Sequence, residues 1–411
     1  MNNISFSSKN ELAVLLKDKA FKKVYIICGH KSYYESGAKK VLDDLITKKN
    51  VGFFFKKFSY PDISELEKII IELKLFSPDL IIAIGGGSVL DYAKMANVLT
   101  NSENLKSEIF NNSYTVKKKL TKLVAIPTTA GSGAEVTSNS VIYIDKIKYS
   151  IESPELRPDF FFLIPELVIG ASYKIKASAG FDAIAQAMES LISRKSNEES
   201  VNFAEKSLNL SSKYYLDYLN KPNNENTSAM CLAANLSGEA ISISKTTAPH
   251  AVSYPFTSIY NVSHGHAVSL TLDKFLKFNY INSEKSNSIF RLKDRYQIMF
   301  DITKTNNIES FDKYLKNLKM HANLENDFSK LGINIVEDYS KIISGINTSR
   351  LANNPIELKD EDLKKNHPKL KFFYCFLCLQ LKPHLYIRLY LKYSVFFLTH
   401  SQTRFSFCVI F

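Results

Sequence analysis

Three short apolar runs, each followed by small or polar residues, constrain the fold of this 411-residue chain most strongly. They are residues 23–28 (KVYIIC), 79–84 (DLIIAI) and 122–126 (KLVAI). Continuous apolar runs of this length are typical of parallel strands that are covered on both faces. Residues 34–48 and 62–75 lie between the runs and have helical spacing of apolar residues. This alternation predicts an α/β layered domain over residues 1–168.

The second half of the chain has a different pattern, because long amphipathic stretches replace the strand-like runs after about residue 169. These stretches are residues 174–196, 199–219, 226–244, 265–281 and 284–303. We expect an all-helical domain over residues 169–370. Two domains also suit a chain of this length, which exceeds what one hydrophobic core usually organises.

The last residues, 371–411, form an atypical tail that is aromatic and basic and contains no Asp or Glu. Every window of about 20 residues, the length needed to cross a bilayer, is interrupted by polar residues or proline. The interrupting residues are Lys382, Pro383, His384, Arg388 and Lys392. Cys375 and Cys378 form a single CxxC pair, which is weak evidence for zinc. We expect no stable membrane insertion and little catalytic importance for this extension.

The net charge of +12 does not indicate a nucleic-acid-binding protein. Five basic residues of the tail account for part of it, and the rest is dispersed among acidic residues without a basic stripe. The five cysteines are irregularly spaced, unlike a disulfide framework, and no apolar signal segment follows Met1. A cytoplasmic location is therefore expected.

Residues 85–94 (GGGSVLDYAK) form a glycine-rich turn between a predicted strand and a predicted helix. Glycines let the backbone approach a ligand closely, and the amide groups at a helix start favour phosphate oxygens. Alone, the segment could be only a tight turn. Residues 126–142 (IPTTAGSGAEVTSNSVI) place hydroxyl side chains after the next predicted strand, where open α/β sheets bind nucleotides. The predicted cofactor-binding residues are Gly85, Gly86, Gly87, Ser88, Asp91, Thr128, Thr129 and Ser132.

The identity of the nicotinamide cofactor is less constrained by the sequence. The first predicted strand leads into residues 28–32 (CGHKS), which contain no acidic side chain to accept a hydrogen bond from the ribose hydroxyl of NAD. The sequence therefore favours NADPH over NADH, unless this loop simply faces solvent.

A second cluster of candidate residues suggests a metal site. Asp182 and Gln186 are four residues apart in GFDAIAQAMES and so lie on one helix face. Three of the eight histidines, His250, His264 and His266, fall within 17 residues. A carboxylate and two imidazoles can hold a divalent cation with coordination positions left open. We predict Asp182, His250 and His264 as ligands, with Gln186 at the fourth position.

These motifs together resemble the iron-containing (group III) alcohol dehydrogenases. The matching segments are GGGSVLDYAK, IPTTAGSGAEVTSNSVI, GFDAIAQAMES, the His250 to His264 spacing with its HG pair, and NTSRLANNPIEL. The resemblance implies a dehydroquinate synthase-like fold, with a nucleotide domain, a helical domain and Fe²⁺ or Zn²⁺ between them. It also implies that Lys148 lies near the cofactor.

Two positions depart from the family pattern. Residue 186 is Gln where the family usually has a fourth ligand, His, and an amide oxygen is a weaker ligand for iron or zinc. Tyr254 stands where many members have a His near the nicotinamide. Proton delivery during catalysis would then fall to Tyr254 or to His266.

The departures resemble one branch of the family, the phosphonoacetaldehyde reductases, through TTAPHAVSYPFTSIYNVSHGHAVSLTL and the Gln of DAIAQAMES. That resemblance implies NAD(P)H-linked reduction of phosphonoacetaldehyde to 2-hydroxyethylphosphonate. A dianionic substrate needs cationic or hydroxyl contacts. Lys245, Thr246 and Thr247, just before His250, are the predicted contacts, unless they are ordinary helix surface.

Other functions remain open at this point. The chain could act on another small alcohol or aldehyde, or be a sugar-phosphate cyclase, a lyase of the same fold. It could also be a non-catalytic binding protein that lost its metal, with Gln186 as the lesion. A homodimer is compatible with the family but is not indicated by any residue pattern.

Overall fold

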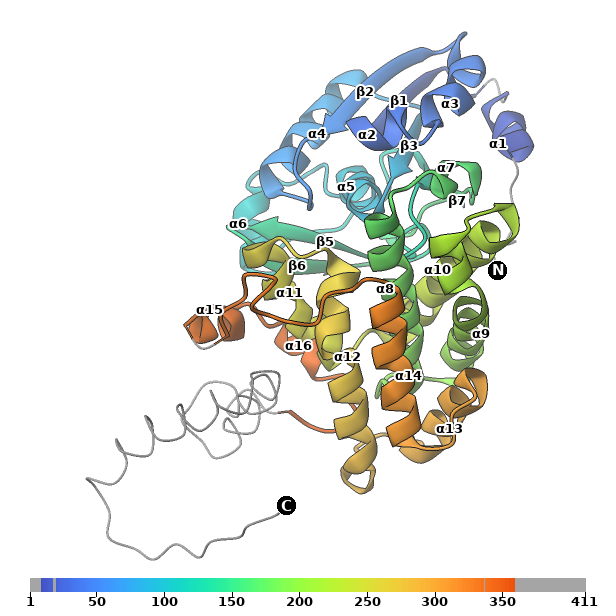
Figure 1. Cartoon of the computed structure of the whole chain (residues 1–411). Helices are drawn as coiled ribbons and strands as arrows, with labels where there is room; N and C mark the ends of the chain where they lie inside the picture. Colours follow the sequence, from blue (N-terminus) through green and yellow to red (C-terminus); the bar gives the residue numbers. More distant parts are fainter. Residues whose placement is uncertain (1–8, 18–19, 336, 359–411) are drawn as a thin grey trace, which may run out of the picture.

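The computed structural model of the chain describes residues 9–17, 20–335 and 337–358 (Figure 1). Its amino-terminal part contains a five-stranded parallel sheet in the order β2-β1-β3-β4-β7. The strands are β1 (Lys23–Gly29), β2 (Asn50–Lys56), β3 (Leu80–Gly85), β4 (Lys122–Pro127) and β7 (Phe160–Phe161). The three predicted strands are present as β1, β3 and β4.

Helices cover both faces of this sheet, which explains why its central strands are apolar throughout. Val24 and Ile26 of β1 pack into one core, and Tyr25 and Ile27 pack into another. Neighbouring side chains of a strand point to opposite faces, so a strand between two helix layers needs apolar residues at every position. The helices are α1 (Lys9–Leu16), α2 (His30–Tyr34), α3 (Ala38–Ile46), α4 (Ile63–Phe76), α5 (Gly87–Val98) and α6 (Leu105–Phe110).

A separate antiparallel hairpin, β5 (Asn139–Ile144) and β6 (Ile147–Glu152), follows β4 and was not predicted. Its two-residue turn consists of Asp145 and Lys146, both with positive φ. Such turns normally contain glycine or asparagine, so the sequence gives a poor signal here. The short segments η1 (Pro154–Leu156) and α7 (Glu166–Ile169) then lead to the helical part. Figure 1 shows the hairpin between the parallel sheet and the helices below it.

The rest of the described chain is helical, as predicted. Its main helices are α8 (Tyr173–Ile192), α9 (Glu198–Asn220), α10 (Asn224–Ser244), α11 (Ala248–Tyr260), α12 (His264–Ile281), α13 (Leu292–Thr303) and α14 (Ile308–His321). Helices α15 (Tyr339–Ser344) and α16 (Thr348–Leu351) follow, and a 3-10 turn, η2 (Ser283–Lys285), precedes α13. Helix α8 is buried on all sides from Phe181 to Ile192, and it runs through the centre of the molecule (Figure 1).

Three expectations about domains and tail have different outcomes. The predicted domain boundary at residue 168/169 falls inside α7 and stays a prediction. The tail at 371–411, with its CxxC pair, lies outside the described residues. In the described part of the chain, helices of the length and apolar content required for a membrane span are absent.

The two halves meet backbone to backbone where the segment after β4 touches α10. Gly133 has φ +60, and a Cβ atom built there would lie 2.4 Å from Cα of Gly238. A Cβ atom at Gly238 would lie 2.6 Å from the Gly133 carbonyl oxygen. Since both obstructions are backbone atoms, side-chain movement cannot relieve them. Glycine at both positions therefore sets the distance between the two halves.

Replacement of Gly238 by Ala is expected to destabilise the protein by about 1–3 kcal/mol, because overpacked sites shift the backbone. The measurement is urea unfolding of Gly238→Ala beside Gly170→Ala. Gly170 has open space around its Cα and a negative φ, which makes it a matched control. Equal stability of the Gly238 variant and the wild type would show that this contact does not fix the halves.

Candidate functional site

The structure brings the two predicted nucleotide loops together at the carboxyl edge of the sheet. Strands β3 and β4 are neighbours, and the Thr128 amide donates to the Gly85 carbonyl at 2.9 Å. A Cβ atom at Gly87 would lie 2.7 Å from Oγ of Ser132, and one at Gly86 would lie 3.5 Å from Oγ1 of Thr129. The glycine loop (residues 85–88) thus lies against the hydroxyl loop (residues 128–133). This arrangement suits contact between the backbone and a phosphate.

The first two turns of α5 contribute Ser88 and Asp91 to this region in different ways. Ser88 is half-buried beside the loop. Asp91 is buried and accepts a hydrogen bond from the Val141 amide at 3.3 Å, and burial raises its pKa. Lys94, one turn later, donates to the carbonyl of Asn139 and to Oγ1 of Thr137. Asp91 and Lys94 therefore attach α5 to the hairpin.

The predicted metal residues converge from three helices. Oδ1 of Asp182, on α8, lies 3.2 Å from Nε2 of His250, on α11. The same oxygen lies 3.9 Å from Nε2 of His264, the first residue of α12. One ligand atom from each of the three residues falls within 4.8 Å of the others. Bonds of about 2.1 Å in a tetrahedral site separate ligand atoms by about 3.4 Å, so the spacing fits iron or zinc.

The protonation states of His264 and His250 also suit the binding of a metal cation. Desolvation and the nearby Lys148 lower the pKa of His264 to about 3, so its imidazole is neutral, as a metal ligand must be. Its Nδ1 atom is buried and has no hydrogen-bond partner among the described residues. Burial alone would lower the pKa of His250, but Glu189 and Asp182 raise it to about 9. A metal would replace the proton that His250 otherwise holds.

Glu189, on α8, holds His250 in place and was missed by the sequence analysis. One carboxylate oxygen contacts Nδ1 of His250, and the other accepts from the Thr247 amide and hydroxyl, both at 2.9 Å. This carboxylate turns Nε2 of His250 toward Asp182, the usual role of an outer partner of a metal-binding His. Asp182, Gln186 and Glu189 have i, i+4, i+7 spacing, a polar line on a buried helix that could have revealed it.

The Gln186 amide is not placed as the predicted metal ligand. Its Nε2 atom donates to Oδ2 of Asp182 at 3.1 Å, and its Oε1 atom accepts from the Ser237 hydroxyl at 2.9 Å. The amide nitrogen, which cannot bind a cation, faces the group of ligands. Gln186 as the fourth ligand therefore stays a prediction, and the orientation of its amide argues against that role.

Tyr254 lies beside the metal residues, one turn after His250. Its ring centroid is 5.9 Å from that of His264, and Nζ of Lys148 lies 3.5 Å from the Tyr254 centroid. Desolvation lowers the pKa of Lys148 to about 7, although Asp91 opposes the shift. Burial raises the pKa of Tyr254, and Arg350 opposes this shift. The predicted relay residue Tyr254 thus lies between the metal residues and two cations.

The other predicted relay residue, His266, is directed elsewhere. Its Nε2 atom donates to the Glu325 carbonyl at 2.7 Å, and its amide donates to Ser178 at 3.1 Å. These contacts attach α12 to α8 and to the segment after α14, so the structure does not bring the His266 ring to the metal residues.

Basic side chains of the helical part contact β6. Arg350, on α16, donates to the Ser150 hydroxyl at 3.2 Å and to Glu152 at 2.8 Å. Lys245 pairs with the same Glu152 at 3.4 Å. Lys148, Ser150 and Glu152 alternate along β6 and therefore share one face. Arg350 was missed, although it lies within the segment NTSRLANNPIEL.

The three predicted substrate contacts do not act as one group. Lys245 pairs with Glu152 of β6, while Thr247 is buried and donates to Glu189. Thr246 is also buried, and its carbonyl accepts from Asn353 at 3.1 Å. Thr247 therefore holds the start of α11 through its hydroxyl and amide, and Thr246 does so through its carbonyl. A substrate-binding role for the three residues stays a prediction.

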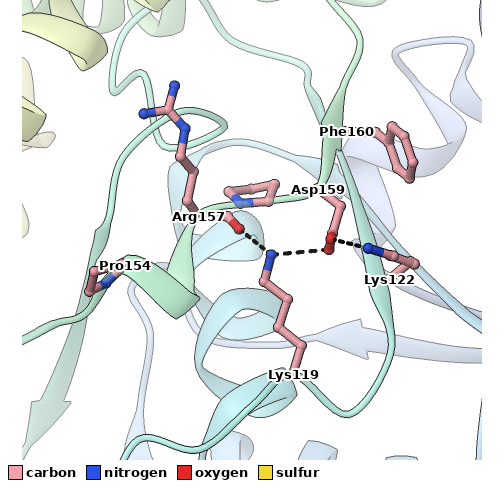
Figure 2. Close-up of a pocket in the computed structure, with 7 residues that line it drawn as sticks. Lys119, Lys122, Pro154, Arg157, Asp159 and Phe160 are labelled. Atoms are coloured by element: carbon pink, nitrogen blue, oxygen red, sulfur yellow. Dashed lines mark hydrogen bonds and ion pairs between the residues drawn. The ribbon is translucent and has the colours of Figure 1, made fainter. Parts of the chain in front are cut away.

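A further pocket lies at the opposite edge of the sheet (Figure 2) and is lined by Lys119, Lys122, Arg157 and Asp159, among others. Asp159 pairs with Lys119 at 3.1 Å and with Lys122 at 2.9 Å, and Arg157 pairs with Glu239. Lys122 begins β4, whereas the hydroxyl loop follows its end. Since ligands bind at the carboxyl ends of such strands and this pocket lies at the opposite ends, it is not the candidate functional site.

Comparison with known proteins identifies relatives over most of the chain. The profile of "Iron-containing alcohol dehydrogenase" matches residues 4–165, and that of "Fe-containing alcohol dehydrogenase family, C-terminal" matches residues 176–367. A phosphonoacetaldehyde reductase of Streptomyces viridochromogenes is 32% identical over 51% of this chain, and the match spans 55% of that protein. A 4-hydroxybutyrate dehydrogenase of Clostridium kluyveri is 28% identical over 71% of this chain and 78% of its own length.

Solved structures agree with this result. The sulfoacetaldehyde reductase of Bifidobacterium kashiwanohense, in complex with NAD⁺, is 25% identical with a TM-score of 0.76, covering 89% of this chain and 94% of that one. An iron-containing alcohol dehydrogenase of Thermococcus thioreducens has a TM-score of 0.79 at 22% identity, covering 90% and 96%. With both profiles matched in order, the chain belongs to the iron-containing alcohol dehydrogenase family.

Proposed function

We propose that this family member is a metal-dependent, NAD(P)H-linked reductase that converts phosphonoacetaldehyde to 2-hydroxyethylphosphonate. The observation that carries the substrate proposal is the position of Lys148 and Arg350 around Tyr254, whose ring also lies beside His264. Only one carbon separates the aldehyde carbon from phosphorus in this substrate. Groups that bind the phosphonate must therefore lie close to those that bind the aldehyde.

The basic side chains beside β6, which are Lys148, Lys245 and Arg350, suit an anionic substrate better than an uncharged one. Arg350 is buried except for 7% of its surface and shares Glu152 with Lys245. An arginine can form two parallel hydrogen bonds to a phosphonate. Two relatives support an anionic aldehyde as the substrate, since the phosphonoacetaldehyde reductase and the sulfoacetaldehyde reductase are named for aldehydes that carry an anionic group.

The chemistry divides between bound groups and side chains. A metal held by Asp182, His250 and His264 would polarise the aldehyde, and the nicotinamide would supply the hydride. Among the side chains, Glu189 orients His250, and the loops after β3 and β4 would hold the cofactor. Tyr254, whose ring lies under Lys148, would donate the proton that completes the alcohol.

Two competing functions have less support. Reduction of another small aldehyde agrees with relatives such as the 4-hydroxybutyrate dehydrogenase but gives no role in substrate binding to Lys148 and Arg350. A non-catalytic protein that lost its metal disagrees with the close approach of Asp182, His250 and His264. NADPH remains the favoured cofactor from residues 28–32, and a homodimer remains open.

The substrate proposal predicts that phosphonoacetaldehyde has a higher kcat/KM than acetaldehyde, lactaldehyde and glyceraldehyde. The assay follows loss of reduced-nicotinamide absorbance in the metal-loaded enzyme, with NADPH and NADH compared in parallel. If the phosphonate gives no advantage over the uncharged aldehydes, the substrate assignment fails, although the enzyme class remains.

Arg350→Gln is expected to lower kcat/KM for phosphonoacetaldehyde by about ten- to hundredfold, mainly through KM, because a charge-assisted contact is lost. The kcat/KM for acetaldehyde should fall far less. Arg194→Gln, at an exposed arginine near the same segment, is the control. An equal loss for both aldehydes would mean that Arg350 supports the fold rather than the anion.

Glu189→Gln is expected to weaken Zn²⁺ binding by about 10–100-fold, the usual effect of removing an outer partner of a ligating His. A competition titration with a chelating dye measures it. Glu239→Gln removes another buried carboxylate, the partner of Arg157, and should retain wild-type affinity. Unchanged affinity in Glu189→Gln would refute the orienting role.

A further inference from the structure

Gln186 is enclosed among polar groups of three segments. Its side chain lies on α8 and is 97% buried, since only 3% of the residue is exposed. The Nε2 atom lies 3.1 Å from Oδ2 of Asp182 and 3.5 Å from the Ser132 carbonyl oxygen in the hydroxyl loop. The Oε1 atom lies 2.9 Å from Oγ of Ser237 on α10. Both ends of the amide are therefore engaged.

The orientation of this amide follows from its neighbours. Oδ2 of Asp182 and the Ser132 carbonyl are acceptors only, so both require a donor. Turning the amide over would place its oxygen 3.1 Å from the Asp182 carboxylate and leave two buried acceptors facing a third. Leaving a buried polar group without a hydrogen-bond partner is unfavourable. The nitrogen therefore faces Asp182, and the Ser237 hydroxyl donates to the oxygen.

The two oxygens of Asp182 consequently have separate partners. Oδ1 faces the imidazoles, at 3.2 Å from His250 and 3.9 Å from His264. Oδ2 is held by Gln186 on the other side. A carboxylate held in this way presents a single oxygen to a cation.

We infer that Gln186 is a positioning residue and that the metal has three protein ligands, with Asp182 binding through Oδ1 alone. The metal then has more positions for substrate or water than a site with four protein ligands. Fewer protein ligands predict a metal that is bound less tightly and exchanges more readily than in a four-ligand site of the same fold.

The test is titration of the metal-free protein with Co²⁺, whose visible absorption reports the number and type of its ligands. Gln186→Leu should keep the band positions and intensities of the wild type, with affinity reduced by about 10–100-fold, as for other outer partners. Gln186→His should shift the bands and tighten binding, because it adds a nitrogen ligand. His264→Ala, which removes a ligand, gives the scale of change for comparison.

Gln297→Leu is the matched control, because Gln297 also donates to an aspartate four residues away on a helix, at 2.7 Å from Asp301. It should leave both the spectrum and the affinity unchanged. The inference is overturned if Gln186→Leu alters the Co²⁺ spectrum as strongly as His264→Ala. Where Gln186→Leu does not fold, the Gln186→His spectrum decides, and a spectrum and affinity equal to those of the wild type would overturn it.

Discussion

The contact between Glu189 and His250 is the interaction on which the rest of the site depends. It joins α8 to the start of α11, because the same carboxylate accepts hydrogen bonds from the Thr247 amide and hydroxyl. Burying carboxylates and imidazoles is unfavourable unless they are paired or bind a metal. Here the chain pairs Glu189 with His250 and leaves Asp182 facing two imidazoles. The polar interior of α8 is thus explained by cation binding rather than by stability alone.

The site owes its location to the meeting of the two halves. Contact between Gly133 and Gly238 brings the hydroxyl loop against α10, and Gln186 connects that loop to Asp182. The hairpin closes the other side by placing Lys148 over Tyr254. The cofactor loops, the metal residues and the basic side chains therefore come from separate segments of the sequence. They come together only when the chain folds.

Elements and residues could be predicted from the sequence where a physical rule allows few residue types at a position. Strands such as residues 23–28 could be predicted because a parallel sheet that is covered on both faces needs apolar residues throughout. Asp182, His250 and His264 could be predicted as a group because carboxylate and imidazole side chains bind divalent metals. The sequence was insufficient where partners depend on packing across segments. Arg350 and Glu152 meet across 198 residues, and the role of Glu189 depends on where α11 begins. Gln186 was placed among the ligands because its direction cannot be read from spacing.

The measurement that tests the central claim most directly is the metal content of purified wild-type protein and of His264→Ala, by elemental analysis. The arrangement of Asp182, His250 and His264 predicts about one divalent metal ion per wild-type chain and a large loss in the variant. Equal, near-zero metal in both proteins after incubation with Fe²⁺ or Zn²⁺ would contradict the account.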